Sequence, residues 1–299
     1  MAITNSLLAT IMPYLPKSLV RPFAKPYVAG ENIDSVIKTA KKLNDDGFST
    51  TLDILGEFVN SENEANKIKS AYSELIKKIS IEKIDSTISV KLTHLGLGIN
   101  PDLGERNIHS LSLIGKENNV GITIDMESSP YTSKTFEIYK NALINNEQMG
   151  TVIQAYLFRS MNDIKNLDNP KLNLRICKGI YNESEDIAIQ DRLAINDNYF
   201  EMAKTLLTGK GYACLATHDL TLIERLESFI EKNNISSDKF EFQVLYGVPM
   251  GNKLDQLKKK GYKIRIYVPF GKAWFEYSVR RLKENPKIIS YVLRNLFKK

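Results

Sequence analysis

The sequence has few of the residues that build disulfide frameworks, metal sites or membrane spans. Its 299 residues include only 2 cysteines, 3 histidines and 1 tryptophan. Two cysteines, Cys177 and Cys214, are too few for a disulfide framework and are typical of a reducing compartment. No apolar run approaches the roughly 20 residues of a spanning helix. The most apolar early stretch, residues 6–15, contains Pro13 and follows no basic residue, unlike a signal peptide, so we expect a cytoplasmic protein.

Several common catalytic motifs are also missing. The chain contains neither G-x-G-x-x-G nor G-x-x-x-x-G-K-[ST], so the usual dinucleotide and phosphate-loop fingerprints are absent. There is no G-x-S-x-G elbow for a serine nucleophile. His94, His109 and His218 have no metal-ligand spacing, and we expect no metal site.

The net positive charge of the chain comes from its C-terminal end. The net charge is +6, and residues 280–299 carry seven basic residues against the single acid Glu284. The rest of the chain is therefore neutral, which disfavours a nucleic-acid-binding protein. Residues 287–299 have the pattern of a basic amphipathic helix. Its apolar side could pack on the protein or lie on an anionic membrane, and the sequence leaves both open.

Eight short segments rich in Ile, Val, Leu and Thr predict strands: residues 50–55, 87–92, 120–126, 151–156, 172–177, 212–216, 240–245 and 263–268. Helical spacing predicts helices between them, including residues 62–79, 133–145, 184–207 and 220–232. Strands that alternate with helices indicate βαβ units and a parallel sheet. We therefore expect the α/β class and a distorted (β/α)8 TIM-type barrel with extra N-terminal helices and a C-terminal helix. Residues 1–45 would form the N-terminal helical segment and residues 46–299 the barrel.

Polar side chains follow or end each predicted strand, as in barrel enzymes, which build their active sites at the carboxyl ends of the strands. They are Glu57, Lys91, Asp125, Gln154, Tyr156, Arg175, Lys178, Thr217, His218, Gln243 and Tyr267. A mouth with three cations and few acids suits an anionic ligand, such as a carboxylate, a phosphate or a cofactor that becomes anionic on reduction. The adjacent Arg280 and Arg281 fit either surface ion pairs on a helix or a two-arginine clamp for a carboxylate.

Seven strings, in order, resemble the barrel motifs of the proline dehydrogenase family. They are SVKL (89–92), TVIQAY (151–156), LRICKGIY (174–181), ATHD (216–219), FQVLYG (242–247), RIYVPFG (265–271) and YSVRRL (277–282). The length is similar to that of the bacterial monofunctional enzymes. Cys177, Ile180 and Tyr246 depart from the residues expected at their positions.

The resemblance implies FAD-dependent oxidation of L-proline to Δ1-pyrroline-5-carboxylate, with electrons passed to a membrane quinone. It implies that Asp125 and Arg175 are catalytic, Asp125 by orienting the neighbouring cations and Arg175 by facing the flavin. The substrate-binding residues would be Lys91, Leu245, Tyr267, Tyr277, Arg280 and Arg281. The FAD-binding residues would be Met126, Gln154, Arg175, Lys178, Gly179, Ile180, Thr217 and His218. Tyr181 would lie near the substrate lid, and Glu57 would pair with Arg280 to close it. A membrane quinone also implies that the cytoplasmic protein contacts the inner face of the membrane.

Two alternatives stay open from the residues themselves, and a third stays open within the resemblance. A Schiff-base aldolase barrel would use Lys91 or Lys178, desolvated to a low pKa, as its nucleophile. A catalytically silent barrel would bind acidic metabolites without flavin. A hydroxyproline dehydrogenase would oxidise a ring-hydroxylated substrate at the same site.

Overall fold

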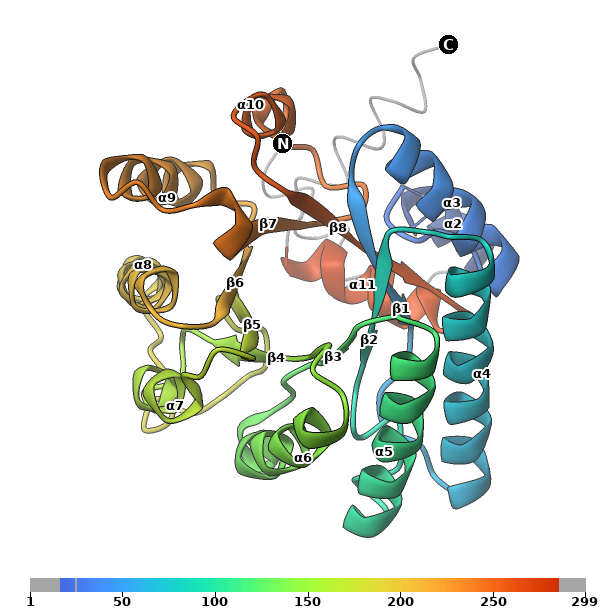
Figure 1. The fold of residues 1–299 in the computed structure, drawn as a ribbon. Coiled ribbons are helices and arrows are strands. Elements are labelled where there is room, and N and C mark those ends of the chain that lie inside the picture. The colour runs from blue at the N-terminus through green and yellow to red at the C-terminus, as the bar shows by residue number, and fades with distance from the viewer. Residues whose placement is uncertain (1–16, 25, 285–299) are drawn as a thin grey trace.

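Eight parallel strands close into a barrel in the order in which they occur along the chain (Figure 1). The structure is a computed structural model that describes residues 17–24 and 26–284, without the side chains of 18–20, 23 and 280–284. The strands are β1 (Ser49–Ile54), β2 (Ser86–Val90), β3 (Ile122–Ile124), β4 (Met149–Gln154), β5 (Asn173–Cys177), β6 (Tyr212–Ala216), β7 (Phe240–Leu245) and β8 (Ile264–Phe270). β1 closes the barrel by pairing all six of its residues with residues 265–270 of β8. The predicted (β/α)8 barrel is confirmed.

Helices surround the strands in the ring that Figure 1 shows. The ring contains α3 (Ile33–Asp45), α4 (Glu62–Ile81), α5 (Pro101–Glu117), α6 (Thr132–Asn145), α7 (Ser160–Leu167), α8 (Arg192–Thr208), α9 (Leu220–Lys232) and α10 (Lys253–Lys259). Two further helices, α2 (Lys17–Ala24) and α11 (Trp274–Glu284), lie outside it. Local sequence sets several of their starts. The side chains of Ser61, Asp191 and Asp219 accept backbone N–H bonds at the first turns of α4, α8 and α9.

The helix predicted over residues 184–207 is wrong in its first part. Residues before Asp191 bond to the loop after β4 instead, because the Ile189 N–H donates to the Tyr156 carbonyl at 2.7 Å. Ala188 also forms an isolated antiparallel bridge with Leu157. Asp191 then caps α8 by accepting the N–H of Ala194 at 2.8 Å. The predicted helix is therefore a loop, which pairs with the loop after β4, followed by the shorter helix α8.

The interior of the barrel is unusually polar. Leu174 and Ile176 of β5 face the surrounding helices in the main hydrophobic core, whereas Arg175 between them is buried inside the barrel. Glu241 and Arg265 are likewise buried, with exposed fractions of 2% and 7%. Barrels are more often filled by layers of aliphatic side chains. Here the same space holds charges, and each has an opposite charge or a hydrogen-bond partner.

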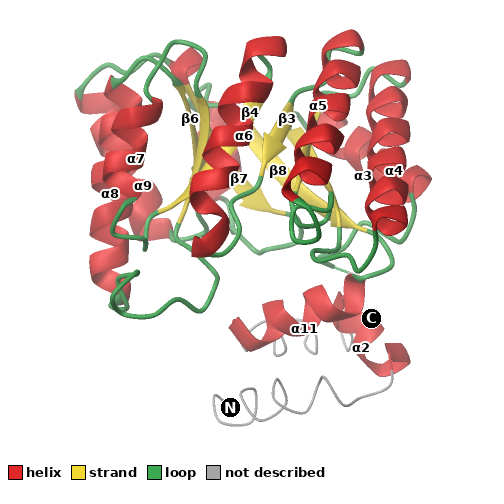
Figure 2. Cartoon of the chain, turned by 90° about the horizontal axis from the view of Figure 1, so that it is seen from below, coloured by secondary structure: helices red, strands yellow, loops and turns green. Residues whose placement is uncertain are grey.

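The helices α2 and α11 lie together beyond one end of the barrel (Figure 2). Ala24, Val28, Leu55, Trp274 and Val279 form a small hydrophobic cluster that joins them to the loop after β1. The two helices thus cover the end where the strands terminate. Within the described residues, no helix is both long and apolar enough to cross a bilayer. The C-terminal helix predicted over residues 287–299 lies outside the described residues.

Candidate active site

A pocket of about 740 Å³ opens at the carboxyl ends of the strands, within the size range of small-molecule and cofactor sites. Most residues singled out from the sequence line it: Glu57, Lys91, Asp125, Met126, Gln154, Arg175, Lys178, Gly179, Ile180, Tyr181, Thr217, His218, Gln243, Leu245, Tyr267 and Tyr277. Tyr156 is buried and does not line it. Arg280 and Arg281 belong to α11, but their side chains lie outside the described residues.

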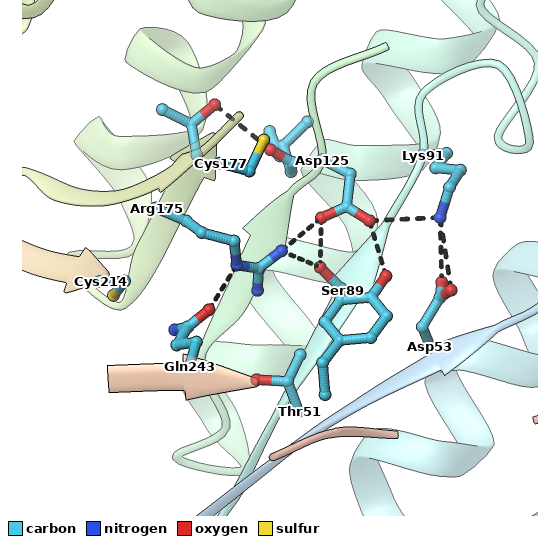
Figure 3. Close-up of polar contacts among 12 residues, drawn as sticks. Thr51, Asp53, Ser89, Lys91, Asp125, Arg175, Cys177, Cys214 and Gln243 are labelled. Atoms are coloured by element: carbon cyan, nitrogen blue, oxygen red, sulfur yellow. Dashed lines mark hydrogen bonds and ion pairs between the residues drawn. The ribbon is translucent and has the colours of Figure 1, made fainter. Parts of the chain in front are cut away.

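Lys91 lies between two carboxylates at the base of the pocket (Figure 3). Its Nζ is 3.3 Å from Asp53 Oδ1 and 3.2 Å from Asp125 Oδ2. Burial disfavours the ammonium charge, but the neighbouring carboxylates outweigh it and hold the pKa of Lys91 well above its usual value. The amine therefore stays protonated and is a poor nucleophile, which counts against the aldolase alternative for this residue.

Asp125 joins Lys91 to Arg175. Arg175 Nη1 donates to Asp125 Oδ1 at 2.7 Å, and Ser89 Oγ donates to the same oxygen at 2.6 Å (Figure 3). Burial alone would raise the pKa of Asp125, but the two cations, Lys91 first, hold it below its usual value. Asp125 is thus a buried, ionised carboxylate. It lies beside the Lys91 strand, as expected, but β4 separates it from β5, so the guanidinium reaches across a strand.

Asp53 is the site residue that the sequence reasoning missed. It is 2% exposed, and burial raises its pKa to about 6, although Lys91 opposes that shift. It lies within β1, two residues after Thr51, which also faces the barrel interior (Figure 3). An acidic residue at an alternating position of an otherwise buried strand is the signal that could have found it.

Tyr267 lies in the middle of β8, not at its end as the sequence suggested. The strand runs on to Phe270 because residues 268–270 still pair with β1. The Tyr267 hydroxyl donates to Asp125 Oδ2 at 2.8 Å. Its ring centroid lies 5.1 Å from the Arg175 guanidinium carbon, within range of a cation–π contact. The ring is therefore held in place from two sides.

A second polar group lies on the β5–β6 side of the pocket. Lys178 Nζ is 2.8 Å from Asp219 Oδ2, and Asn196 Nδ2 donates to the same oxygen at 2.9 Å. His218 Nε2 accepts the Leu245 N–H at 2.8 Å, so that nitrogen carries no proton. The charge of Lys178 is thus paired with Asp219, which follows β6. The sequence did not predict this pair.

Gln154 presents an acceptor that no described residue satisfies. Its Nε2 donates to the Glu127 carbonyl at 2.9 Å, but its Oε1 is buried without a hydrogen-bond partner among the described residues. Buried amide oxygens are nearly always paired. Since Gln154 lines the pocket, this oxygen is available to a ligand with an N–H or O–H group.

No group of three or more His, Cys, Asp or Glu side chains within residues 17–24 and 26–284 could hold a metal ion. Cys177, which also lines the pocket, is a neutral thiol because burial raises its pKa to about 12. What the pocket offers is paired cations, ionised carboxylates and one unsatisfied amide oxygen. This arrangement can orient an anionic ligand at the carboxyl ends of the strands.

The model of the family described as "Proline dehydrogenase" matches residues 36–294, which span every residue that lines the pocket. The chain belongs to the proline dehydrogenase family. Among curated proteins, Proline dehydrogenase 1 of Bacillus subtilis is 37% identical over 276 residues, or 92% of this chain and 91% of the relative. Proline dehydrogenase of Deinococcus radiodurans is 33% identical and covers 92% and 90% of the two chains.

A solved structure of the same family shares the fold. The crystal structure of proline utilization A (PutA) from Bdellovibrio bacteriovorus, inactivated by N-propargylglycine, has a TM-score of 0.83 and 26% sequence identity. It covers 94% of this chain, which spans only about a third (34%) of that one. The matches to proline dehydrogenases therefore run nearly end to end, as expected for the bacterial monofunctional type, whereas PutA contains much that this chain has no counterpart for.

Proposed function

We propose that this chain oxidises L-proline to Δ1-pyrroline-5-carboxylate with bound FAD and passes the electrons to a membrane quinone. The observation that carries the proposal is the Asp53–Lys91–Asp125–Arg175 cluster at the carboxyl end of the barrel. It presents cations for a substrate carboxylate and for an electron-rich cofactor. The family match supplies the reaction class.

FAD suits the residues present. Gln154 offers a buried, unsatisfied acceptor for a ring N–H, and Arg175 and Lys178 line the pocket as cations. Met126, Gly179, Ile180, Thr217 and His218 would complete its binding site. When bound, FAD would supply the two-electron oxidation that no side chain of the chain can perform.

The substrate carboxylate would be bound by Lys91, Arg280 and Arg281. The raised pKa of Lys91 keeps its amine protonated at every physiological pH. Tyr277 lines the pocket from α11, the helix that carries both arginines. Leu245 and Tyr267 would pack on the pyrrolidine ring and fix its carbon–nitrogen bond against the cofactor. This orientation, with water excluded, is the main contribution of the protein.

Asp125 and Arg175 would act together in catalysis. Asp125 orients both Lys91 and Arg175 through bonds of 3.2 and 2.7 Å. Arg175, fixed beside the cofactor, would stabilise the negative charge that develops there on reduction. Tyr181 and Glu57, which both line the pocket, would contribute to closing the lid over bound substrate.

Hydroxyproline dehydrogenase is the second candidate function. Tyr267 argues against it, because the hydroxyl of this tyrosine is already bonded to Asp125 and its ring leaves no partner for a ring hydroxyl. We expect a clearly higher kcat/KM for proline than for 4-hydroxyproline. Tyr267→Ser should reduce this difference, chiefly by lowering kcat/KM for proline. Equal rates with both substrates in the wild type would favour the second function.

The test is proline-dependent reduction of a soluble quinone, with the product identified by its mass, two hydrogens below that of proline. An aldolase would instead give a borohydride-trapped adduct on Lys91 or Lys178, and a silent barrel would bind proline analogues without turnover. We propose that the reaction takes place in the cytoplasm, with the protein at the inner face of the membrane. Absence of quinone reduction in flavin-loaded protein would refute the proposed reaction.

A further inference from the structure

A row of buried polar side chains runs from the pocket through the barrel interior toward its opposite end. It starts at Arg175, whose Nε donates to Gln243 Oε1 at 2.6 Å (Figure 3). Gln243 Nε2 in turn donates to Glu241 Oε1 at 2.6 Å. Arg265 Nε donates to the same Glu241 oxygen at 2.6 Å, and Arg265 Nη1 to the Thr50 carbonyl at 2.6 Å.

The charges at its two ends fix the orientation of the Gln243 amide. A guanidinium can only donate and a carboxylate can only accept. Rotation of the amide by half a turn would set its NH₂ group against Arg175 and its oxygen against Glu241. Both contacts would be repulsive in a place where Gln243 is only 5% exposed. The amide is therefore a directional link between a cation and an anion.

The far end of the row is anchored. Glu241 is 2% exposed, and although burial opposes ionisation, Arg265 holds its pKa below the usual value. Tyr212 also donates to Glu241, through its hydroxyl at 3.3 Å. Arg265 is tied to β1 through Thr50. The Glu241 carboxylate on β7 is thus held by side chains from β6 and β8, and the β8 side chain is itself bonded to β1.

We propose that Gln243 is a positioning residue that aims the Arg175 guanidinium into the pocket, and that the buried Glu241–Arg265 pair sets its orientation. Asp125 binds Nη1 of Arg175 and Gln243 binds Nε, so the guanidinium plane is held at two separate nitrogens. Nη1 also donates to Ser89 Oγ at 3.2 Å and the Tyr267 ring lies over the guanidinium, so Gln243 is the contact that fixes its Nε side. The inference rests on the proposed role of Arg175 beside the flavin.

The test compares three variants with the wild-type holoenzyme. Gln243→Leu removes both amide contacts. Asn146→Leu is the matched control, because Asn146 is 2% exposed and its amide also makes two bonds, to the Ser112 carbonyl and the Gln148 N–H, away from the pocket. Gln243→Asn keeps an amide but shortens the side chain by one methylene, so that it cannot keep the contacts to Arg175 and Glu241 at once.

Thermal stability, kcat, KM and the flavin midpoint potential are measured for each. We expect Gln243→Leu and Asn146→Leu to lose stability alike. Of these two, only Gln243→Leu should lower kcat, by about tenfold or more, and move the potential to more negative values. Gln243→Asn should lose less stability than Gln243→Leu but should still lower kcat and move the potential in the same direction, because one of the two amide contacts is lost. If Gln243 had a structural role alone, Gln243→Leu and Asn146→Leu would change kcat and the flavin potential to the same extent for the same loss of stability.

The outcomes separate this inference from the proposed function. A wild-type protein that binds no flavin would overturn both. A flavin-loaded wild type with unchanged kcat and potential in Gln243→Leu would overturn the inference alone. If Gln243→Leu does not fold, Gln243→Asn decides: wild-type kcat and potential in it would contradict the positioning role.

Discussion

At the scale of single residues, the site is a set of charges that share partners. Lys91 has two carboxylates within 3.3 Å, and Asp125 has two cations. The two carboxylates that contact Lys91 differ, because burial raises the pKa of Asp53 to about 6. Its charge therefore changes near neutral pH, while that of Asp125, with a lowered pKa, does not. Ionised Asp53 would therefore compete for Lys91 with the substrate carboxylate that we propose it binds.

This competition predicts a pH dependence of ligand binding. Below a pH of about 6, Asp53 takes up a proton and stops neutralising Lys91. A proline-like ring carboxylate that lacks the amine should then bind roughly tenfold more tightly, on the order of one screened charge contact. Asp53→Asn is neutral at every pH, so it should bind the ligand tightly and show no such dependence. Titrations by calorimetry across this range measure it, and a flat profile in the wild type would count against the role of Asp53.

The residues that the sequence could and could not reveal differ in their surroundings. Lys91 and Arg175 stood out because a charge within an apolar run is costly unless it is paired. Their partners are set by the barrel closure, which brings together residues as far apart in sequence as Asp125 and Tyr267. Asp53 was missed because it lies within its strand and not at the end, where we looked for polar residues. Its contact with Lys91 becomes visible only in the closed barrel.

At the scale of elements, strands were easier to predict than the loops that carry the site. β6 and β7 match their predicted bounds, because runs of β-branched and aromatic residues end at clear turns. The loop before α8 was predicted as helix, since its partners in the turn after β4 are distant in sequence. The same loop begins at Gly179, which has a φ of +116° and packs against the Tyr156 ring.

Gly179 provides a test of how this loop supports the cofactor site. A Cβ there would overlap the Tyr156 ring, and its φ is unfavourable for any side chain. We expect Gly179→Ala to displace the loop and to lower FAD retention on gel filtration by about tenfold or more. Gly251→Ala is the control, because Gly251 also has a positive φ, +55°, but has open space around it. It should cost about 1–2 kcal/mol of stability and retain FAD. Equal retention in both variants would contradict this role.

The helix α11 carries the two arginines of the proposed carboxylate clamp. Arg280→Met and Arg281→Met should each lower kcat/KM for proline by roughly 30-fold or more, because loss of a charged partner at a buried contact costs about 2–5 kcal/mol. FAD content should be unchanged, which an absorbance ratio measures. Near-normal kcat/KM in both variants would mean that the pair forms surface ion pairs only.

At the scale of the whole molecule, the net charge and most of the proposed active site lie in different parts of the chain. The described barrel holds balanced, internally paired charges, whereas the excess of +6 lies in residues 280–299. A basic terminal segment is suited to an anionic membrane surface, where each cation contributes on the order of 1 kcal/mol. That distribution could be predicted from the sequence. The polar interior of the barrel could not, because barrels usually fill this space with aliphatic side chains.

Deletion of residues 287–299 tests the membrane contact. The full chain should co-sediment with anionic vesicles at low salt and be released at high salt, because the attraction is screened. The shortened chain should stay in the supernatant, and neither should bind neutral vesicles. Unchanged binding after deletion, or a shortened protein that unfolds, would favour a helix packed on the barrel instead.

The most direct test of the proposed function is the visible spectrum of the purified protein before and after addition of proline without oxygen. We predict a yellow protein whose colour passes into the supernatant on acid precipitation, since FAD would be held without a covalent bond. Proline should bleach the flavin band, and a soluble quinone should restore it. A colourless protein that also fails to bind added FAD, or a flavin band that proline leaves unchanged, would contradict the account.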